Sequence, residues 1–382
     1  MDMIRLDEAC EILNGFAFKS ENYVDSGIRI IRIANVQKGF VEDNTPAFYP
    51  LDSSGLEKYM LEEGDLLMSL TGNVGRVAML EKKFMPAALN QRVACLRLKT
   101  DKLSKGYLFH ILNSDFFEQK CIQSSKGVAQ KNMSTGWLKD YEIPVYPKEE
   151  QEKITKILDR TRNIISCRTQ EIQKLDELIK ARFVEMFGDP VSNSNGLPEA
   201  TLPELGEFGR GISKHRPRND SKLLGGDYPL IQTGDVANAG LYITSYSSTY
   251  SKLGLKQSKM WDKGTLCITI AANIAKTAIL KFSACFPDSI VGFNANEKTN
   301  NIFIHYWFSF FQAILESQAP ESAQKNINLK ILSELKVIVP VKDKQDEFAD
   351  FVKQADKSKV VAQQMLDETQ KLFDSLMQEY FG

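Results

Sequence analysis

Apolar residues recur every seven positions through the middle of the chain, between Lys148 and Phe187. Charged and amide side chains occupy the other faces of this stretch. The spacing predicts one long helix with a single apolar seam. At a rise of 1.5 Å per residue, about 40 residues form a helix roughly 60 Å long. A lone helix leaves such a seam uncovered, so the pattern also predicts a partner helix.

A matching seam lies between Asp343 and Phe381, with Lys359 as its polar interruption. A lysine at such a position more often tunes the register of a helix pair than abolishes pairing. We therefore expect these two helices to pack on each other, although a pair of ordinary scaffold helices is the alternative. The expected packing residues are Leu158, Ile165, Ile172 and Ile179 on the first helix and Val352, Leu366 and Phe373 on the second.

The whole chain is an internal repeat in two copies. Residues 30–36 correspond to 230–236, and Gly64–Leu70 corresponds to Gly264–Ile270. The run Ala-Gln-Lys-Asn at 129–132 recurs at 323–326. Each copy is a globular part followed by a long helix. Short apolar runs between Gly and Asn turns predict strands at 29–36, 65–70, 93–98 and 141–145, and apolar spacing predicts helices at 107–117 and 302–315.

The pattern therefore indicates an α+β protein with two mixed α/β domains and a long antiparallel two-helix coiled coil with pseudo-two-fold symmetry. The expected boundaries are 1–147 for the first globular domain, 148–188 for the first helical spacer, 189–341 for the second globular domain and 342–382 for the last spacer. An antiparallel pair would hold one globular domain at each end, farther apart than one turn of DNA, about 34 Å.

Composition narrows the class of protein. Apolar residues make up 43% and charged residues 25%, as in globular proteins. No apolar run approaches the roughly 18 residues of a membrane span, and the acidic N-terminal residues do not resemble a secretion signal. The six cysteines have no paired spacing, which is typical of reduced thiols, so we expect a cytoplasmic location. Three scattered histidines argue against a zinc site.

Motifs for catalysis are missing from the sequence. It contains no phosphate-binding Gly-x-x-x-x-Gly-Lys loop, no Gly-x-Gly-x-x-Gly and no Asn-Pro-Pro-Tyr/Phe of adenine methyltransferases. Asp65 with Glu81, Lys82 and Lys83 resembles a metal-dependent nuclease site, but the second copy has Thr265, Lys281, Phe282 and Ser283 at these positions. We therefore predict no catalytic residue, no metal ligand and no cofactor in this chain.

The duplicated motifs resemble the specificity subunits of type I restriction-modification systems (the HsdS family). The similarity covers the whole chain and is carried by Gly64–Leu67 with the turn 71–76, the two Ala-Gln-Lys-Asn runs, and the helix entry at 147–151 and exit at 187–190. In the second copy Ala272 and Ala275 replace Gly72 and Gly75, and because alanine disfavours positive φ we expect that turn to differ in shape.

The resemblance implies a non-catalytic protein in which each globular domain, a target-recognition domain, reads one half of a split double-stranded DNA sequence. The helix pair would set the gap between the halves. It further implies two methylation subunits, which use S-adenosylmethionine, and two motor-nuclease subunits, which use ATP and Mg²⁺. A two-headed coiled-coil scaffold without a DNA role and a single-chain nuclease or methyltransferase are the competing hypotheses.

DNA contact requires Lys or Arg on phosphates and side chains that read base edges. Arg76 and Lys276 follow equivalent turns, and Lys131 and Lys325 recur in the Ala-Gln-Lys-Asn runs. A basic loop near 214–222 has only Lys19 as its relative in the first copy. The alternative for each of these residues is a solvated surface charge without a role in DNA binding. The candidate DNA-binding residues are Lys19, Arg76, Arg92, Lys131, Lys214, Arg216, Arg218, Lys276 and Lys325.

Overall fold

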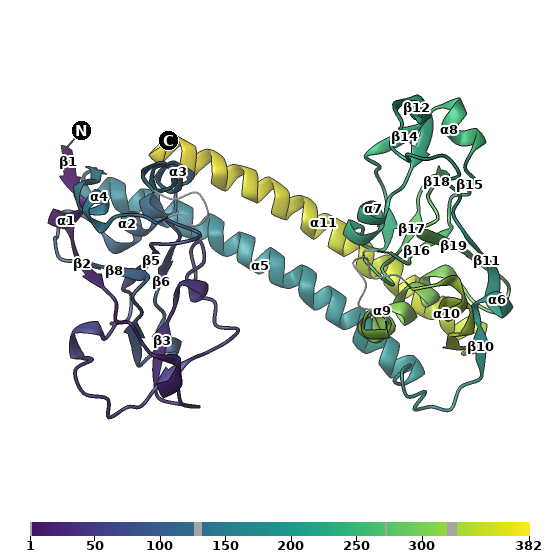
Figure 1. The fold of residues 1–382 in the computed structure, drawn as a ribbon, viewed down its shortest axis with the longest axis horizontal. Coiled ribbons are helices and arrows are strands. Elements are labelled where there is room, and N and C mark those ends of the chain that lie inside the picture. Colours follow the sequence, from purple (N-terminus) through teal and green to yellow (C-terminus); the bar gives the residue numbers. More distant parts are fainter. Residues whose placement is uncertain (1, 126–131, 272, 319–326) are drawn as a thin grey trace. The chain divides into compact units, whose positions relative to one another are not determined.

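The computed structural model describes residues 2–125, 132–271, 273–318 and 327–382. The chain divides into two compact units (Figure 1). Unit 1 is Met1–Arg168 together with Met365–Gly382, and unit 2 is Thr169–Gln364. Each unit combines a mixed α/β part with segments of two long helices. Among the described residues, no helix has both the length and the apolar character that crossing a membrane requires.

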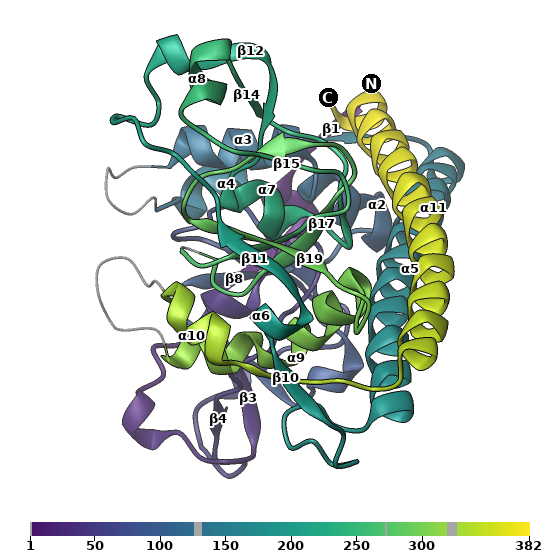
Figure 2. The same cartoon turned by 90° about the vertical axis from the view of Figure 1, so that its right-hand side faces the viewer.

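The two long helices are α5 (Lys148–Phe187) and α11 (Lys342–Phe381). They lie side by side and run in opposite directions in both views (Figures 1 and 2). In unit 1, Leu158 of α5 shares a buried cluster with Met377 and Phe381 of α11. In unit 2, Ile179 of α5 shares a buried cluster with Val352 of α11. The predicted antiparallel helix pair and the two mixed α/β domains are confirmed.

Burial along the seam varies with position. Leu158, Ile179 and Val352 are fully buried, whereas the remaining expected packing residues are half-buried: Ile165, Ile172, Leu366 and Phe373. Lys359 lies in unit 2 at the position that Ile165 has in the first copy. Its Nζ lies 2.5 Å from Asp176 Oδ1 on α5, and its side chain is only 19% exposed. Because a desolvated charge needs a partner, Asp176 makes a lysine tolerable in this seam.

A buried glutamine fastens each long helix to the globular part that precedes it. Gln151 is fully buried; its Oε1 accepts a hydrogen bond from Ser104 N at 2.8 Å, and its Nε2 donates to the Tyr146 carbonyl at 2.8 Å. Gln345 occupies the equivalent place, accepting from Thr299 Oγ1 at 2.8 Å and donating to the Pro340 carbonyl at 2.8 Å. Buried amides are stable only when paired in this way, so these glutamines fix how each helix begins.

Unit 1 holds three small sheets, a four-stranded β2-β8-β5-β6, a three-stranded β4-β3-β7 and the pair β1-β9. The strands are β1 (Asp2–Arg5), β2 (Cys10–Asn14), β3 (Ile28–Ile31), β4 (Phe48–Tyr49), β5 (Leu66–Ser69), β6 (Val77–Met79), β7 (Ala87–Leu89), β8 (Val93–Leu98) and β9 (Glu142–Val145). The helices are α1 (Leu6–Ala9), α2 (Lys105–Leu112), α3 (Asp115–Ser124) and α4 (Thr135–Asp140). They pack with the start of α5 and the end of α11 over a core that includes Tyr107, Phe117 and Leu158.

Unit 2 has the same strand order with one further strand, β13 or β15, in each of its two larger sheets, which are β11-β19-β16-β17-β13 and β14-β12-β18-β15, beside the pair β10-β20. The strands are β10 (Glu199–Thr201), β11 (Gly206–Arg210), β12 (Leu224–Leu230), β13 (Tyr242–Ile243), β14 (Ser248–Tyr250), β15 (Met260–Trp261), β16 (Leu266–Thr269), β17 (Thr277–Leu280), β18 (Ala284–Cys285), β19 (Ile290–Ala295) and β20 (Lys336–Ile338). The helices are α6 (Leu202–Leu205), α7 (Thr233–Asn238), α8 (Lys252–Lys256), α9 (Asn301–Gln318) and α10 (Leu329–Glu334). The matching strand order confirms the internal repeat.

Two local expectations were wrong. The strand expected at 29–36 ends at Ile31, and Ile33–Asn35 form a short 3-10 turn because Asn35 Oδ1 accepts a hydrogen bond from Arg32 N at 2.9 Å. The single helix expected at 107–117 is two helices. Ser114 separates them: its Oγ accepts from Phe117 N at 3.1 Å, which caps the start of α3.

His305 of α9 makes the stability of unit 2 sensitive to pH. Its Nδ1 lies 2.9 Å from Thr277 Oγ1 on β17, and burial, reinforced by nearby Lys359, lowers its pKa to about 4. Below a pH of about 6.5 the unfolded chain binds a proton that the folded chain does not bind, so stability falls as the pH drops from about 6.5 to about 4. We expect a loss of up to about 3 kcal/mol over this range.

Thermal unfolding of the wild type and of His305→Gln, followed by tryptophan fluorescence between pH 7 and pH 4, tests this expectation. Glutamine does not titrate and can still bond to Thr277, so the variant should lose less stability over this range. Parallel pH profiles for the two proteins would contradict it.

Candidate nucleic-acid interface

Tight turns at the end of β5 and at the end of β16 place two cations equivalently. In unit 1, Ser69 Oγ accepts a hydrogen bond from Arg76 N at 3.1 Å and donates to a carbonyl within the turn. In unit 2, Thr269 Oγ1 accepts from Lys276 N at 3.1 Å and donates in the same way. A hydroxyl can make both bonds because it has one donor and two lone pairs. The backbone therefore has the same hydrogen bonds at Arg76 and at Lys276.

Ala275 keeps the turn geometry of Gly75, contrary to the expectation from the sequence, while Ala272 lies outside the described residues. Gly75 has φ 86° and Ala275 has φ 57°. Their N–H groups donate to the carbonyls of Ser69 at 3.0 Å and Thr269 at 2.8 Å. Ala275 thus adopts the left-handed conformation at a cost of roughly 1–2 kcal/mol. The reverse exchange is blocked in unit 1, because a Cβ on Gly75 would lie 2.8 Å from Cys121 Cβ.

Several loops of unit 1 meet at this edge. Ile31 pairs with Leu89 in parallel strands and Ser69 pairs with Val93 in antiparallel strands, so the chain leaves β3, β5 and β7 on one side. Across the loops, Gln37 Oε1 accepts a hydrogen bond from Arg76 Nη1 at 2.5 Å. The edge is therefore a set of loops held by the sheets beneath them.

The residues that directly follow the duplicated Ala-Gln-Lys-Asn runs join the same edge. Met133 N donates to the Leu70 carbonyl at 2.9 Å, and Ile327 N donates to the Ile270 carbonyl at 3.0 Å. Lys131 and Lys325 themselves lie outside the described residues.

Arg92 and Lys19 lie in neighbouring segments. The Arg92 carbonyl accepts from Leu70 N at 3.1 Å, and its side chain is exposed. Ser289 is its counterpart, because its carbonyl accepts from Ile270 N at 3.0 Å. Lys19 is 74% exposed and lies 3.7 Å from Glu21. The structure thus brings Arg76 and Arg92 to the two ends of the β5 turn region, with Lys19 in an exposed loop of the same unit.

The basic loop of unit 2 is fixed by hydrogen bonds at its start. Gln257 Oε1 accepts from Lys214 N at 2.7 Å and from His215 N at 3.0 Å. Arg216 and Arg218 both pair with Asp288, which precedes β19. The loop is therefore tied to the edge where the β16 turn begins.

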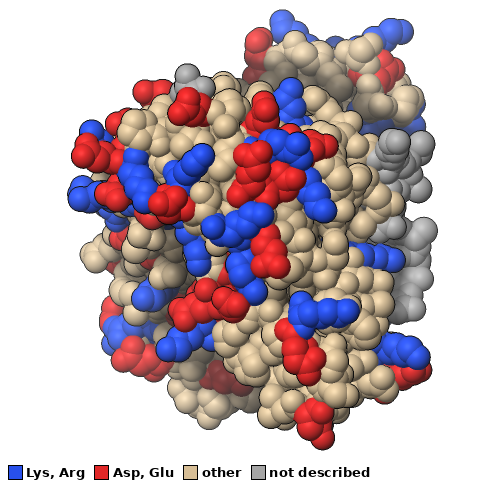
Figure 3. All heavy atoms as spheres, turned by 90° about the vertical axis from the view of Figure 1, so that its left-hand side faces the viewer, with Lys and Arg blue, Asp and Glu red and all other residues tan. Residues whose placement is uncertain are grey.

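This loop stays positive although it is partly neutralised. It carries Lys214, Arg216, Arg218 and Lys222, against Asp220 within the loop and Asp288 beside it. Hydrogen bonds from Lys222 N and His215 lower the pKa of Asp220, which keeps that carboxylate charged. On the one face shown in Figure 3, blue Lys and Arg side chains lie interspersed with red Asp and Glu, so that face has no broad basic surface.

The sequence reading missed the side chains that hold these cations. Gln37, Gln257 and Asp288 each fix a candidate contact residue, yet each is far from its partner in sequence, so no local pattern marks them. Gln232 was also missed, although the repeat pairs it with Arg32.

Asp65, which resembles a nuclease residue in the sequence, forms a structural ion pair. Asp65 is 4% exposed, and its Oδ2 lies 2.6 Å from Arg97 Nη2. The same Oδ2 accepts from Glu62 N at 2.8 Å, while Glu81 pairs with Lys83 at 2.9 Å. Within the described part of the chain, no group of three His, Cys, Asp or Glu residues could hold a metal ion.

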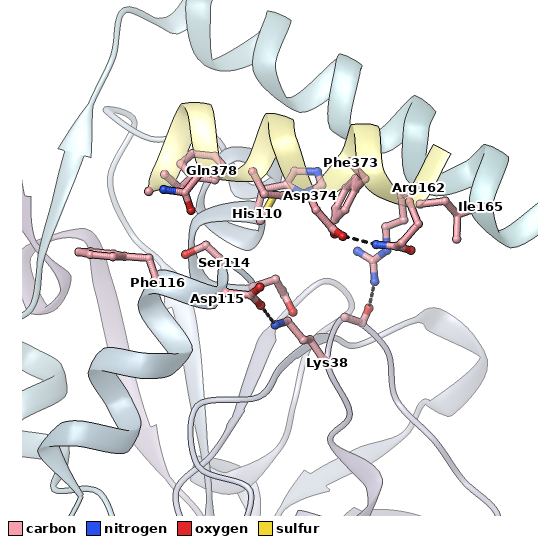
Figure 4. Close-up of a pocket in the computed structure, with 16 residues that line it drawn as sticks. Lys38, His110, Ser114, Asp115, Phe116, Arg162, Ile165, Phe373, Asp374 and Gln378 are labelled. Atoms are coloured by element: carbon pink, nitrogen blue, oxygen red, sulfur yellow. Dashed lines mark hydrogen bonds and ion pairs between the residues drawn. The ribbon is translucent and has the colours of Figure 1, made fainter. Parts of the chain in front are cut away.

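A cavity of about 420 Å³ lies in unit 1 between the 37–39 loop, the α2–α3 connection, α5 and the end of α11 (Figure 4). Its charged groups already have partners. Lys38 pairs with Glu118 at 2.8 Å and also with Asp115. Arg162 Nη2 donates to the Gly39 carbonyl at 2.6 Å. Arg162 thereby ties α5 to the loop that carries Gln37 and, through it, Arg76.

Comparison with known proteins shows which family has this architecture. The profile of the type I restriction modification DNA specificity domain matches residues 1–177 and 199–368. The chain is 26% identical to the MjaX type I restriction enzyme specificity subunit of Methanocaldococcus jannaschii, over 88% of this chain and 79% of that protein. It is 25% identical to the EcoBI specificity subunit of Escherichia coli, over 92% of this chain and 78% of that protein.

Among solved structures, the S subunit of a type I restriction-modification system from M. genitalium has a TM-score of 0.64 and 15% identity, and the alignment covers 100% of this chain and 96% of that one. At this identity the likeness shows the fold. The family profile spans most of the chain in two copies, so the protein belongs to the type I restriction-modification DNA specificity subunits, the HsdS family. It is the non-catalytic specificity subunit and works with partner subunits of a type I complex.

Proposed function

We propose that each globular domain, 1–147 and 189–341, reads one half of a bipartite DNA sequence, and that the paired helices 148–188 and 342–382 set the gap between the halves. The observation that carries this is the repeated edge in the two units. A hydroxyl-supported turn presents Arg76 in one and Lys276 in the other. Because the adjoining loops differ between the units, each edge offers different side chains to bases while keeping one cation for the backbone.

The remaining candidate contacts fit the same division of roles. Lys19, Arg92, Lys214, Arg216 and Arg218 are exposed or half-exposed cations suited to phosphates, which position a protein on DNA without reading its sequence. Lys131 and Lys325 precede segments that join the edge in both units, which supports the same role for them.

We further propose that two methylation subunits dock along α5 and α11 and supply S-adenosylmethionine and adenine methylation. Two motor-nuclease subunits would supply ATP- and Mg²⁺-dependent cleavage. In this proposal the partners, and not this chain, bind S-adenosylmethionine, ATP and Mg²⁺. The free cysteines, five buried and one exposed, suit a reducing cytoplasm, where we place the complex.

Exchanging residues 1–147 for the corresponding domain of another specificity subunit tests the division of roles. We expect one half of the recognised sequence to change and the other half to stay the same, because each edge is built within its own unit. Sequencing of methylated adenines in cells that carry the complex reads out both halves at once. A change in both halves, or in neither, would refute the proposal.

The docking proposal predicts an effect at two equivalent leucines. Leu178 on the unit 2 part of α5 is 51% exposed, and Leu372 on the unit 1 part of α11 is 54% exposed. The repeat places them at the same helical position. Exposed leucines there suit contacts with two copies of one partner, so we expect Leu178→Glu or Leu372→Glu to weaken one binding event by roughly 5- to 30-fold, or about 1–2 kcal/mol.

Sedimentation of the complex would then show one methylation subunit lost from each single variant and both lost from the double variant. Unchanged melting of the isolated chain controls for folding. Full assembly of the double variant at low concentration would rule out these leucines as docking residues.

A further inference from the structure

Gln232 lies two residues after the end of β12, at the position that corresponds in the repeat to Arg32 after β3. The two side chains are held differently. Arg32 Nη2 donates to the carbonyl and hydroxyl of Thr45, so its guanidinium binds a neighbouring loop of the same unit. Gln232 is exposed, and its Nε2 donates a long hydrogen bond of 3.4 Å to Ser248 Oγ. Its backbone is nevertheless fixed, because Gln232 N donates to Asp235 Oδ2 at 2.8 Å at the start of α7. A rigid backbone with a loosely held amide is suited to reading a ligand.

Gln232 lies at a cavity of about 220 Å³. The polar residues that line this cavity are Arg218, Asn219, Gln232, Thr233 and Ser289, and its apolar residues are Leu224, Leu230, Tyr250 and Pro287. Tyr250 and Leu230 are 2% and 5% exposed, so the apolar part is recessed. The cavity thus has an apolar floor and a rim of amide and hydroxyl groups.

The cavity lies beside the candidate interface, because two of its lining residues belong to both. Ser289 is the counterpart of Arg92, and its carbonyl accepts from Ile270 N at the beginning of the β16 turn. Arg218 is held by Asp288 at the same edge. A duplex whose phosphates meet the basic loop would therefore bring base edges close to Gln232.

The chemistry favours one kind of base pair. A glutamine amide pairs bidentately with adenine N6 and N7 in the major groove, and apolar side chains contact the thymine methyl group. Both features belong to the exposed edge of a single A·T pair.

We propose that Gln232 is a specificity-determining residue that reads the adenine of an A·T pair in the half-site contacted by unit 2. The apolar floor of the cavity receives the methyl group of the paired thymine. This inference rests on the proposed function, because it assigns a base to one of the two recognition edges.

Selection from duplexes with randomised half-sites, using the full chain with its methylation partners, tests the assignment. The wild-type complex should select A·T at one position of the second half-site. Gln232→Ala should reduce discrimination at that position by about 5- to 150-fold, the equivalent of 1–3 kcal/mol for a bidentate pair. Gln232→Glu keeps the size of the side chain but accepts only, so it should shift the preference toward cytosine. Replacing the paired thymine by uracil should weaken wild-type binding severalfold.

The matched control is Asn195→Ala, an exposed amide in the segment that follows α5, which should leave every position unchanged. An unaltered preference in both Gln232 variants would overturn the assignment. Equal loss of preference at all positions would also overturn it, because it would indicate damage to the fold or to phosphate binding. If the wild-type complex selects no split sequence at all, the proposed function itself fails, which is a separate result.

Discussion

Replacing Phe183 by alanine is expected to lower the free energy of unfolding of unit 2 by about 3–5 kcal/mol. Phe183 is fully buried on α5. Its ring centroid lies 5.3 Å from that of Phe303 on α9 and 5.3 Å from that of Phe348 on α11. The Phe187 ring lies 5.0 Å away on the same helix. One ring therefore joins three helices, and its removal leaves a cavity that these rigid elements cannot close.

Thermal or denaturant unfolding, followed by the fluorescence of the buried Trp307, measures this loss. Val184→Ala is a suitable control, because the neighbouring side chain is 40% exposed and should change stability by about 0.5 kcal/mol or less. Similar effects of the two substitutions would mean that the cluster contributes little to holding α5 in unit 2.

Removing three cations from the basic loop is expected to weaken DNA binding without changing the recognised sequence. The combined variant Lys214→Ala, Arg216→Ala and Arg218→Ala deletes up to three phosphate contacts. Each contact releases counterions, so the slope of log affinity against log salt should become shallower by nearly three, and affinity near physiological salt should fall on the order of 10- to 100-fold.

Affinity measured at several salt concentrations, for a specific and a scrambled duplex, tests this expectation. The loss should be similar for both duplexes. Asp288→Asn provides a change in the opposite direction, because it frees Arg216 and Arg218 and should strengthen binding to both. An unchanged salt dependence in the triple variant would exclude the loop from the phosphate contacts.

Two kinds of sequence pattern proved informative for different reasons. The seven-residue spacing located α5 at its observed ends and α11 within one residue, because a long helix repeats one geometric rule along its whole length. The duplicated motifs located the turns before Arg76 and Lys276, because the same local hydrogen bonds require the same residue types. Neither pattern could show that Ser114 splits α2 from α3, since a cap depends on one hydroxyl.

Sequence patterns predicted only part of the candidate interface. Basic residues could be recognised as candidates, but their partners could not. Asp288 holds Arg216 and Arg218 from about 70 residues away in sequence, and Gln37 holds Arg76 from the other side of a loop. Such pairs form only after strands from separate parts of the chain have aligned.

The amino-acid order alone thus decided that this protein is a duplicated α/β unit with two long, mutually compatible helices, because periodicity and repetition are local properties of a chain. The folded structure decided which cations are held, that Ala275 accepts a left-handed turn, that Lys359 is paired with Asp176, and that Gln232 borders a recessed apolar cavity. These outcomes depend on distances between residues remote in sequence, and such distances are set by packing across the whole unit.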